Sequence, residues 1–566
     1  MLEPVDRDAG GRICKWTVDK HIIHTPNIAI VINPNNMPVT PLELKKDFGA
    51  EIIITNSYII NKHEELKQQA LKQGLHKFLN WSGPIYTDSG TFQMYSQGVK
   101  TIDPIGIVEF QKTIGSNIVT PVDVFTFPDD TAAVAKRKLN ETVRRIMAAR
   151  KAVSDRYLVG PIQGGMYLDL RKAACKKVAK IQPDVFAIGG IVPLMESYRF
   201  DELAEIIITC KKNLPFTKPV HAFGAGHPML FAFLTAIGCD LFDSAMYSLA
   251  AQRDGYLTTS GTIPLFDLQE FPCSCPVCSK ADVIDIKKLP KPEREVFLAK
   301  HNLYVTFQEM RAIRTAIRGQ WLWELVQERA RAHPTLLEAL HWTLARHAKW
   351  LLNLEWVSKR SALFWSGEES GHRPEILRAL EWLKRVKSKR KFTKPPFGKI
   401  PVGLKSVYPF GQSIIPGVPE PKIKTTPKEI FSATVDYQFG NSTSKRFKDV
   451  RLEISRRTGR IRRVYKDNTL LGTIRPADGF FVPTIEGAKI LKGKIKKVKI
   501  TDPEVAGIVS RGGSVFVKFV KPLDVIFPGE EVSIVDKNNK IIGVGQTLLN
   551  SEEMKQLKRG VAIVRR

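Results

Sequence analysis

Eight short apolar runs, alternating with segments of helical composition, constrain the fold of residues 28–247 most strongly. The runs are IAIVIN (28–33), EIIITNS (51–57), GPIYTDSG (83–90), NIVTPVDVF (117–125), YLVGPIQGG (157–165), DVFAIGGIV (184–192), PVHAFGAG (219–226) and DLFDSAMY (240–247). Nearly continuous apolar runs are typical of parallel strands, because helices cover both faces of such a sheet. Eight alternating units favour an α/β fold with a parallel (β/α)₈ barrel of the TIM type, and a doubly wound open sheet is the alternative.

Polar residues and glycines lie at or just after the carboxyl ends of these runs. They are Asp88, Asp123, Gln163, Gly189, Gly190, Gly224 and Asp243. The carboxyl ends of barrel strands share one rim, where catalytic groups collect. Any one of these residues is also explained as a turn or cap residue. Three acids and an amide on one rim nevertheless predict a catalytic site, and a pair such as Asp88 and Asp243 suits the cleavage of a glycosidic bond.

A second candidate site follows the eighth run. Cys273, Cys275 and Cys278 lie in PCSCPVCSK, and His301 follows in AKHNLYVTF. Three thiolates and one imidazole form a closed tetrahedral Zn²⁺ shell, which is typical of a structural site. Ordinary buried thiols and an iron–sulfur cluster are the alternatives. We expect one structural Zn²⁺ per subunit.

The rest of the chain indicates several further domains, because 566 residues exceed what one hydrophobic core supports. A helical region spans 305–357, and a proline-rich junction places a boundary near residue 425. We expect a barrel with its zinc segment, a linker with a first C-terminal domain, a second C-terminal domain and a last, β-rich domain. Their predicted bounds are 1–357 (zinc segment 273–301), 358–425, 426–492 and 493–566.

The charge predicts a polyanionic partner. The net charge is +29, of which +18 falls in residues 391–566. Such a segregated excess favours contact with nucleic acid, although basicity can also serve solubility. The sequence contains no secretory signal and no apolar run long enough to cross a membrane, and its scattered cysteines show no disulfide pattern. A cytoplasmic protein without a membrane partner is therefore expected.

The motifs resemble a known enzyme family. YTDSGTFQ, PIQGG, AIGG, FGAGHP, FDSAMY and CSCPVC followed by HNLYVTF are similar to the motifs of tRNA-guanine transglycosylases. ITNSYII, VPLMESYRF, RARAHP, KRSALF and YPFGQSIIP resemble the archaeal branch, the archaeosine tRNA-guanine transglycosylases. The likeness covers essentially the whole chain and implies that the last domain is a PUA domain. Two positions depart from the family pattern, namely PVDVFTF at 121–127 and Thr91, which leaves the base preference open.

The resemblance implies roles for the rim residues. Asp243 would be the nucleophile that attacks the ribose anomeric carbon, and Asp88 would be the general acid and base. The remaining implied residues bind the base: Asp123, Gln163, Gly189 and Gly190 by hydrogen bonds, and Phe92 and Phe223 by stacking. For both phenylalanines, plain core packing is the alternative.

The resemblance also implies a reaction and partners. The archaeal enzymes exchange the guanine at position 15, in the D-loop of tRNA, for 7-cyano-7-deazaguanine through a covalent glycosyl-aspartate. The expected partners are tRNA, held at its D-loop and acceptor end, a small 7-deazaguanine base, and a second subunit in a homodimer. The alternatives are a queuosine-type enzyme acting on the anticodon wobble guanine and a catalytically silent paralogue that only binds tRNA.

Overall fold

The computed structural model describes residues 2–91, 103–419 and 422–566 and comprises two compact units. The first unit consists mainly of Gly11–Ile317 and Leu325–Leu340. The second unit consists of Glu3–Gly10, Arg318–Glu324 and His341–Arg566. Each unit has its own hydrophobic core.

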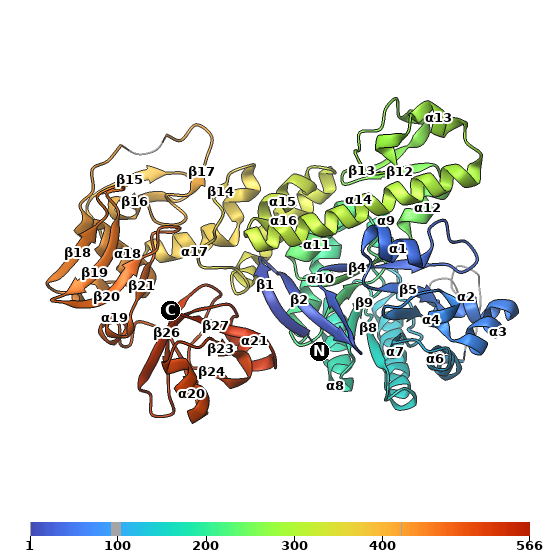
Figure 1. Cartoon of the computed structure of the whole chain (residues 1–566), viewed down its shortest axis with the longest axis horizontal. Coiled ribbons are helices and arrows are strands. Elements are labelled where there is room, and N and C mark those ends of the chain that lie inside the picture. The colour runs from blue at the N-terminus through green and yellow to red at the C-terminus, as the bar shows by residue number, and fades with distance from the viewer. Residues whose placement is uncertain (1, 92–102, 420–421) are drawn as a thin grey trace. The chain divides into compact units, whose positions relative to one another are not determined.

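The first unit is built around a closed barrel of eight parallel strands, as the sequence predicts (Figure 1). The strands are β4 (Asn27–Ile32), β5 (Ile53–Asn56), β6 (Ile85–Asp88), β7 (Ile118–Val119), β8 (Tyr157–Ile162), β9 (Val185–Ile188), β10 (Val220–Ala222) and β11 (Leu241–Ser244). They follow one another around the barrel in chain order, and β11 closes it by pairing with β4. Inward side chains such as Ala29, Tyr86 and Ala187 fill the interior.

Helices connect consecutive strands on the outside of the barrel (Figure 1). They are α1 (Pro41–Phe48), α2 (Ser57–Lys62), α3 (Glu64–Gln73), α4 (Leu75–Phe78), α6 (Pro104–Thr113), α7 (Ala132–Ala152), α8 (Leu168–Ile181), α9 (Val192–Glu196), α10 (Phe200–Asn213) and α11 (Pro228–Ala236). In α7, Thr131 caps the first turn, and Leu139 and Ile146 belong to its buried face. This pattern explains why a strongly charged helix packs on the barrel along one side only.

One strand is shorter than the sequence predicts. The run at 117–125 forms only the two-residue strand β7, because Pro121 has no N–H for the ladder. At Thr120 the Gln111 side chain takes the place of a neighbouring strand. Its Oε1 accepts from the Thr120 N–H and its Nε2 donates to the Thr120 carbonyl, both at 2.9 Å. Asp123 therefore lies in a loop beyond the strand.

The segment after the barrel carries the cysteines. Helix α12 (Met246–Gln252) leads into the hairpin β12 (Gly255–Thr258) and β13 (Gly261–Pro264), and α13 (Val283–Lys288) precedes the long helix α14 (Lys291–Gly319). His301 lies on α14, and the three cysteines lie in the loop and short turn between β13 and α13. The hairpin, this loop and α14 thus form one small subdomain.

The second unit contains helices followed by small sheets. Its principal helices are α15 (Leu322–Ala330), which begins in this unit, α16 (Pro334–Leu351), which ends in it, α17 (Pro374–Leu383), α18 (Pro427–Phe439), α19 (Ile485–Ile490), α20 (Pro503–Ser510) and α21 (Ser551–Gln556). The pairs β14 (Leu363–Phe364) with β17 (Ser413–Ile414), and β15 (Lys391–Lys394) with β16 (Gly398–Pro401), are two-stranded sheets. The four-stranded sheet consists of β18 (Val450–Ile454), β19 (Ile461–Lys466), β20 (Thr469–Ile474) and β21 (Phe481–Pro483).

A six-stranded sheet ends the chain, in the order β23–β27–β26–β25–β22–β24. Its strands are β22 (Lys497–Ile500), β23 (Val515–Phe516), β24 (Val520–Pro522), β25 (Glu531–Val535), β26 (Ile541–Thr547) and β27 (Val561–Arg565).

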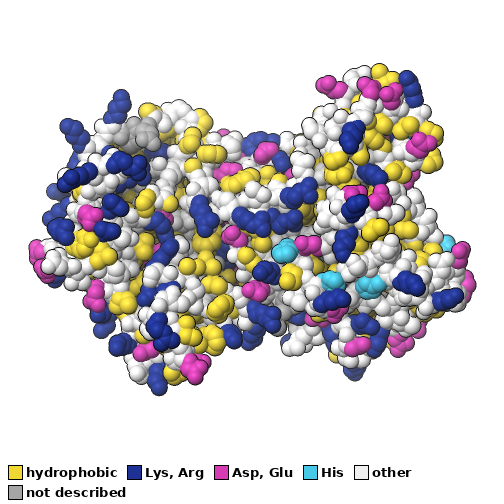
Figure 2. Space-filling view, viewed as in Figure 1, with side chains coloured by type: hydrophobic (Ala, Val, Ile, Leu, Met, Phe, Trp, Pro, Cys, Tyr) yellow, Lys and Arg dark blue, Asp and Glu magenta, His cyan; other side chains and the backbone are white. Residues whose placement is uncertain are grey.

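Figure 2 shows many Lys and Arg side chains on the surface of this second unit. Across the residues described, every helix is too short or too polar to span a bilayer.

Candidate functional site

Asp88 and Asp243 both lie inside the carboxyl-terminal end of the barrel. Asp88 ends β6 two residues after the inward-facing Tyr86, and Asp243 pairs in register with the inward-facing Ala29. Because side chains alternate along a strand and in-register neighbours share a face, both carboxylates belong to the barrel interior. The structure therefore brings together two acids that are 155 positions apart in the sequence.

Asp243 is held by two donors on one oxygen. The His221 Nε2 lies 2.8 Å from Asp243 Oδ1, and the Gly224 N–H donates to the same oxygen at 2.6 Å. Gly224 has a φ of +85°, a left-handed conformation that glycine adopts without strain, and it turns this N–H toward β11. Only 9% of the Asp243 surface is exposed, so a reactant must approach from the barrel mouth.

Asp88 is in a different environment. Its Oδ2 accepts from Asn56 Nδ2 at 3.1 Å and from the Gly90 N–H at 3.2 Å. Burial, followed by the charges of Asp123 and Asp243, raises the pKa of Asp88 to about 7 in spite of the N–H groups. A carboxyl group with this pKa can both give and take a proton at neutral pH.

Asp123 and Gln163 form a second polar pair at the same rim. The Gln163 Nε2 donates to Asp123 Oδ2 at 2.5 Å, and Gln163 Oε1 accepts from the Thr126 N–H at 3.3 Å. Burial raises the pKa of Asp123, and the hydrogen bonds from Gln163 and Thr91 oppose the rise. Thr91, one of the departures from the family motif, thus contacts the acid predicted to bind the base.

Gly189 and Gly190 leave room for this pair. A Cβ at Gly189 would lie 2.7 Å from Gln163 Nε2, and one at Gly190 would lie 3.0 Å from Gln163 Oε1. The Gly189 N–H already donates to the Ile162 carbonyl at 3.1 Å. The geometry therefore gives Gly189 a steric role beside Gln163.

A buried arginine holds the ends of β8 and β9 in place. Arg171 on α8 is fully buried, and its guanidinium donates to the carbonyls of Gly165, Ile162 and Gly189 at 2.7–2.9 Å. Burial lowers its pKa. These bonds fix the backbone on both sides of Gln163.

The two phenylalanines differ in what the structure describes. Phe223 follows β10 and is half-buried, with its ring centroid 6.4 Å from that of Tyr86 in a stacked arrangement and 5.0 Å from that of His221. Phe92 lies outside the described residues. Phe223 thus adjoins the carboxylates, and its ring is only partly covered by neighbours.

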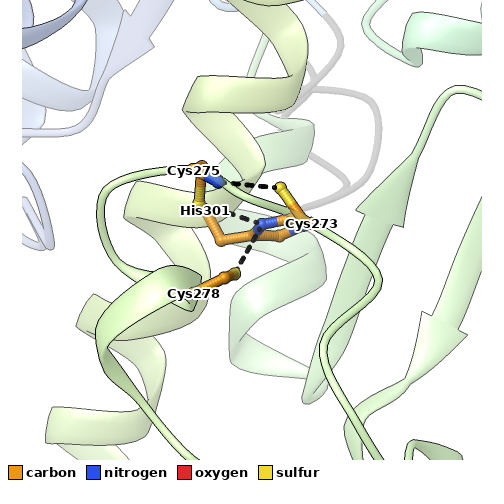
Figure 3. Close-up of side chains that lie close together, drawn as sticks. All are labelled: Cys273, Cys275, Cys278 and His301. Atoms are coloured by element: carbon orange, nitrogen blue, oxygen red, sulfur yellow. Dashed lines mark hydrogen bonds between the residues drawn. The ribbon is translucent and has the colours of Figure 1, made fainter.

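The predicted metal ligands converge in one cluster (Figure 3). The ligand atoms of Cys273, Cys275, Cys278 and His301 all lie within 4.8 Å of one another. His301 Nδ1 faces Cys278 Sγ at 3.3 Å and Cys275 Sγ at 3.7 Å, and its Nε2 donates to the Leu257 carbonyl at 2.9 Å. A backbone acceptor of this kind fixes the imidazole as a metal ligand. Three sulfur atoms and one nitrogen thus form a group that could hold a metal ion.

Sequence reasoning missed four residues of the rim site: Asn56, Tyr86, Arg171 and His221. Asn56 ends its strand as the predicted rim residues do, so its position was a usable signal. Tyr86 and His221 lie inside apolar runs and Arg171 lies on a charged helix, where core packing or solvent exposure is the ordinary expectation.

The comparisons with known proteins cover nearly the whole chain. The family model described as queuine tRNA-ribosyltransferase matches residues 6–335, the patch-forming domain C2 of tRNA-guanine transglycosylase matches 431–497, and the PUA domain matches 496–564. The chain therefore belongs to the tRNA-guanine transglycosylase family. Family membership and the PUA domain indicate a protein that binds tRNA and a nucleobase.

Curated relatives narrow the likeness to one branch. The tRNA-guanine(15) transglycosylase of Thermococcus kodakarensis is 42% identical over 98% of this chain and 97% of its own length. The enzymes of the same name from Pyrococcus furiosus and Methanocaldococcus jannaschii are 41% and 37% identical, over 99% and 98% of this chain and 97% of their own lengths. The archaeal resemblance of the sequence motifs is thus confirmed along the full length.

Proposed function

We propose that this protein exchanges guanine at position 15 of tRNA for 7-cyano-7-deazaguanine, a step in archaeosine biosynthesis. The observation that carries the proposal is the meeting of Asp88, Asp123 and Asp243 at one barrel rim, in a chain that matches the tRNA-guanine(15) transglycosylases along its length. The exchange needs no nucleotide triphosphate, because a covalent glycosyl-aspartate retains the free energy of the glycosidic bond.

In the first displacement, Asp243 attacks the ribose C1′ of the target nucleotide. The bond from Asp243 to C1′ forms, the C1′–N9 bond breaks, and its electron pair leaves with the guanine. Asp88 in its protonated form gives a proton to the departing base, which spares the base a full negative charge.

In the second displacement, the incoming base replaces Asp243. Asp88, now ionised, removes the proton of the incoming base, whose nitrogen attacks C1′ and expels the Asp243 carboxylate. Two inversions in series retain the configuration at C1′. The pKa of about 7 supports both roles of Asp88 at neutral pH.

The base is held by groups that match a guanine edge. The Asp123 carboxylate accepts from the 2-amino and ring N–H groups, and Gln163 and the Gly190 N–H address the carbonyl, with Gly189 leaving room for them. Adenine-like bases are rejected because they would leave these buried groups unpaired. Phe223 and Phe92 stack on the base faces, worth about 1–3 kcal/mol per base.

The metal would be Zn²⁺ in a structural role. Three thiolates and one imidazole match its preferred ligands, and four protein ligands leave no open position for chemistry. Cys273, Cys275, Cys278 and His301 would hold it, where it would join the loop after β13 to α14. The same subdomain is where we place the homodimer contact.

The C-terminal domains would bind the tRNA body. Guanine 15 lies in the tRNA core, so exposing it costs unstacking and unpairing energy that backbone contacts must offset. We assign the acceptor end to the PUA domain and divide the chain at 357, 425 and 492. The exposed turn between β18 and β19, with Arg456, Arg457 and Arg460, is one phosphate-binding surface. A cytoplasmic location follows from the tRNA substrate.

The test is incorporation of labelled guanine into unmodified archaeal-type tRNA without any nucleotide triphosphate. Wild-type protein should label the tRNA and form a protein–tRNA adduct that survives denaturation, whereas Asp243→Asn should do neither. The matched control is Glu205→Gln, at a half-buried position of α10. Asp240→Asn is unsuitable as a control because Asp240 accepts hydrogen bonds from the buried Arg12 side chain. No incorporation by folded wild-type protein would refute the exchange activity.

Substrate variants separate the alternatives. A tRNA with adenine in place of guanine 15 should not be labelled, and a tRNA changed only at the wobble position should be labelled normally. The reverse pattern would identify a queuosine-type enzyme. Binding of tRNA without labelling of either variant would identify a silent paralogue.

A further inference from the structure

The two oxygens of Asp243 have different surroundings. Both hydrogen bonds to the carboxylate, from His221 Nε2 at 2.8 Å and from the Gly224 N–H at 2.6 Å, end on Oδ1. Among the residues that the structure describes, no donor reaches Oδ2. Oδ1 is therefore fixed by the protein, and Oδ2 remains for a bond to a substrate.

The His221 ring is held from several sides. It lies in the middle of β10, in register with Ala187 of β9 and Leu241 of β11, and it is fully buried. The Tyr86 and Phe223 rings pack against it with centroids 5.6 and 5.0 Å away. A ring enclosed in this way cannot rotate to form a hydrogen bond with water instead. Its hydrogen bond to Asp243 is therefore a fixed feature of the site.

The proton positions in this group follow from the chemistry of the partners. An ionised carboxylate only accepts hydrogen bonds, so His221 Nε2 carries a proton. The Tyr86 hydroxyl lies 3.4 Å from His221 Nδ1. Burial, and then the charges of Asp243, Asp88 and Asp123, raise the pKa of Tyr86 well above its ordinary value, so the hydroxyl keeps its proton and can donate to Nδ1 in the tautomer that carries its proton on Nε2. Tyr86 thereby orients the imidazole toward Asp243.

We propose that His221 stabilises the Asp243 carboxylate as the leaving group of the second displacement, holding Oδ1 together with Gly224 while Oδ2 forms and releases the bond to C1′. This inference rests on the proposed exchange reaction. In the covalent intermediate Oδ1 is the carbonyl oxygen of a neutral ester, a weaker acceptor than a carboxylate. As the Oδ2–C1′ bond breaks, its electron pair returns to the carboxylate, and the His221 and Gly224 donors become stronger partners.

Loss of the His221 donor should therefore slow the two displacements unequally. The Gly224 N–H is part of the backbone and still orients Asp243, so attack on C1′ should change little. Release of the ester loses one hydrogen bond to a developing charge, which corresponds to a rate about 10- to 100-fold lower. A purely structural role would instead slow both displacements and reduce the amount of adduct.

The experiment uses full-length protein with His221→Leu, which removes the donor. Adduct formation is followed with tRNA alone on denaturing gels after rapid quenching, and adduct release is followed after adding labelled guanine. We expect adduct formation to change less than about threefold and release to slow at least about tenfold, so that adduct accumulates during turnover. Tyr86→Phe should give a smaller change in the same direction.

Two further variants keep the test decisive. His221→Gln can place an amide N–H near the position of Nε2 and should restore release to within about threefold of wild type. His227→Asn replaces a nearby histidine that caps α11 and lies outside the contacts of Asp243, and it should leave both rates unchanged. If His221→Leu does not fold, the Gln and Tyr86 variants carry the test.

The outcomes separate this inference from the proposed function. Wild-type protein that forms neither adduct nor labelled tRNA would refute the exchange reaction itself. If the wild type is active, three results would overturn the role of His221 alone. These are equal slowing of both steps in His221→Leu, less adduct in that variant, and no rescue by His221→Gln.

Discussion

Replacing Asp88 by asparagine should stabilise the barrel while abolishing base exchange. Burial and the neighbouring charges raise the pKa of Asp88 from 3.8 to about 7. The folded protein therefore destabilises the ionised form relative to the unfolded chain, which is already ionised above about pH 4. Asparagine carries no charge and escapes this cost.

The size of the gain follows from the shift. A change from 3.8 to about 7 corresponds to an upper limit of about 4 kcal/mol. Asp88 is partly exposed, so solvent screens part of this, and asparagine accepts the Asn56 and Gly90 hydrogen bonds less strongly than a carboxylate. We expect a net gain of about 1–2 kcal/mol above pH 7.

The gain must depend on pH with a defined sign. Below about pH 4 the aspartate is protonated in both states, and the charge term vanishes. Between pH 4 and 7 only the unfolded aspartate ionises, so the advantage of asparagine grows; above pH 7 it is constant. Urea unfolding followed by tryptophan fluorescence at pH 5 and pH 8 measures the difference, which should be clearly larger at pH 8.

Asp184 is a matched control in the same barrel with the opposite behaviour. Burial tends to raise the pKa of Asp184, but Lys218 and Arg150 hold this pKa below its ordinary value. Asp184→Asn should therefore destabilise the barrel by similar amounts at pH 5 and pH 8, since both lie above its unfolded pKa. A gain for Asp88→Asn that is equal at the two pH values, or a loss at pH 8, would refute the reasoning.

Three further predictions concern other parts of the molecule. Gly189→Ala should raise the KM for free guanine at least about tenfold, because its Cβ would lie 2.7 Å from Gln163 Nε2; an unchanged KM would contradict the steric role. Removing the metal with a chelator should lower the melting temperature and expose the cysteines to thiol reagents, and Zn²⁺ should reverse both; a metal-free protein with unchanged melting would contradict a structural metal. Arg456→Gln with Arg457→Gln should weaken tRNA binding and reduce the salt dependence of log Kd by about one to two phosphate contacts; an unchanged slope would exclude this turn from the tRNA surface.

The barrel could be predicted from the sequence because its strands are buried on both faces. Such strands are uniformly apolar, and each ends where a polar residue or glycine interrupts the run. This made Asp88 and Asp243 visible as members of one rim. The run at 117–125 misled because apolar residues continue beyond Pro121 in a loop, where Gln111 takes over the hydrogen bonds of the ladder.

The partners of the carboxylates could not be predicted in the same way. His221 is 22 positions from Asp243 and 135 positions from Tyr86 in the sequence. Only closure of the barrel brings the three side chains together. A histidine inside an apolar run is ordinarily a core residue. The cysteine cluster was easier to predict from the sequence, because three of its four ligands lie within six residues of one another. Such a short spacing brings them together with little help from the tertiary fold.

The two roles that we propose for Asp88 and Asp243 are matched by two different environments on one rim. Asp88 is half-buried near two other acids, and its pKa is raised to about 7, which suits the proposed acid and base. Asp243 receives two N–H groups on one oxygen, which suits a group that must leave as a carboxylate. If the proposed roles are right, the difference between the two aspartates depends on their hydrogen-bond partners, which are Asn56 and Gly90 for Asp88 and His221 and Gly224 for Asp243.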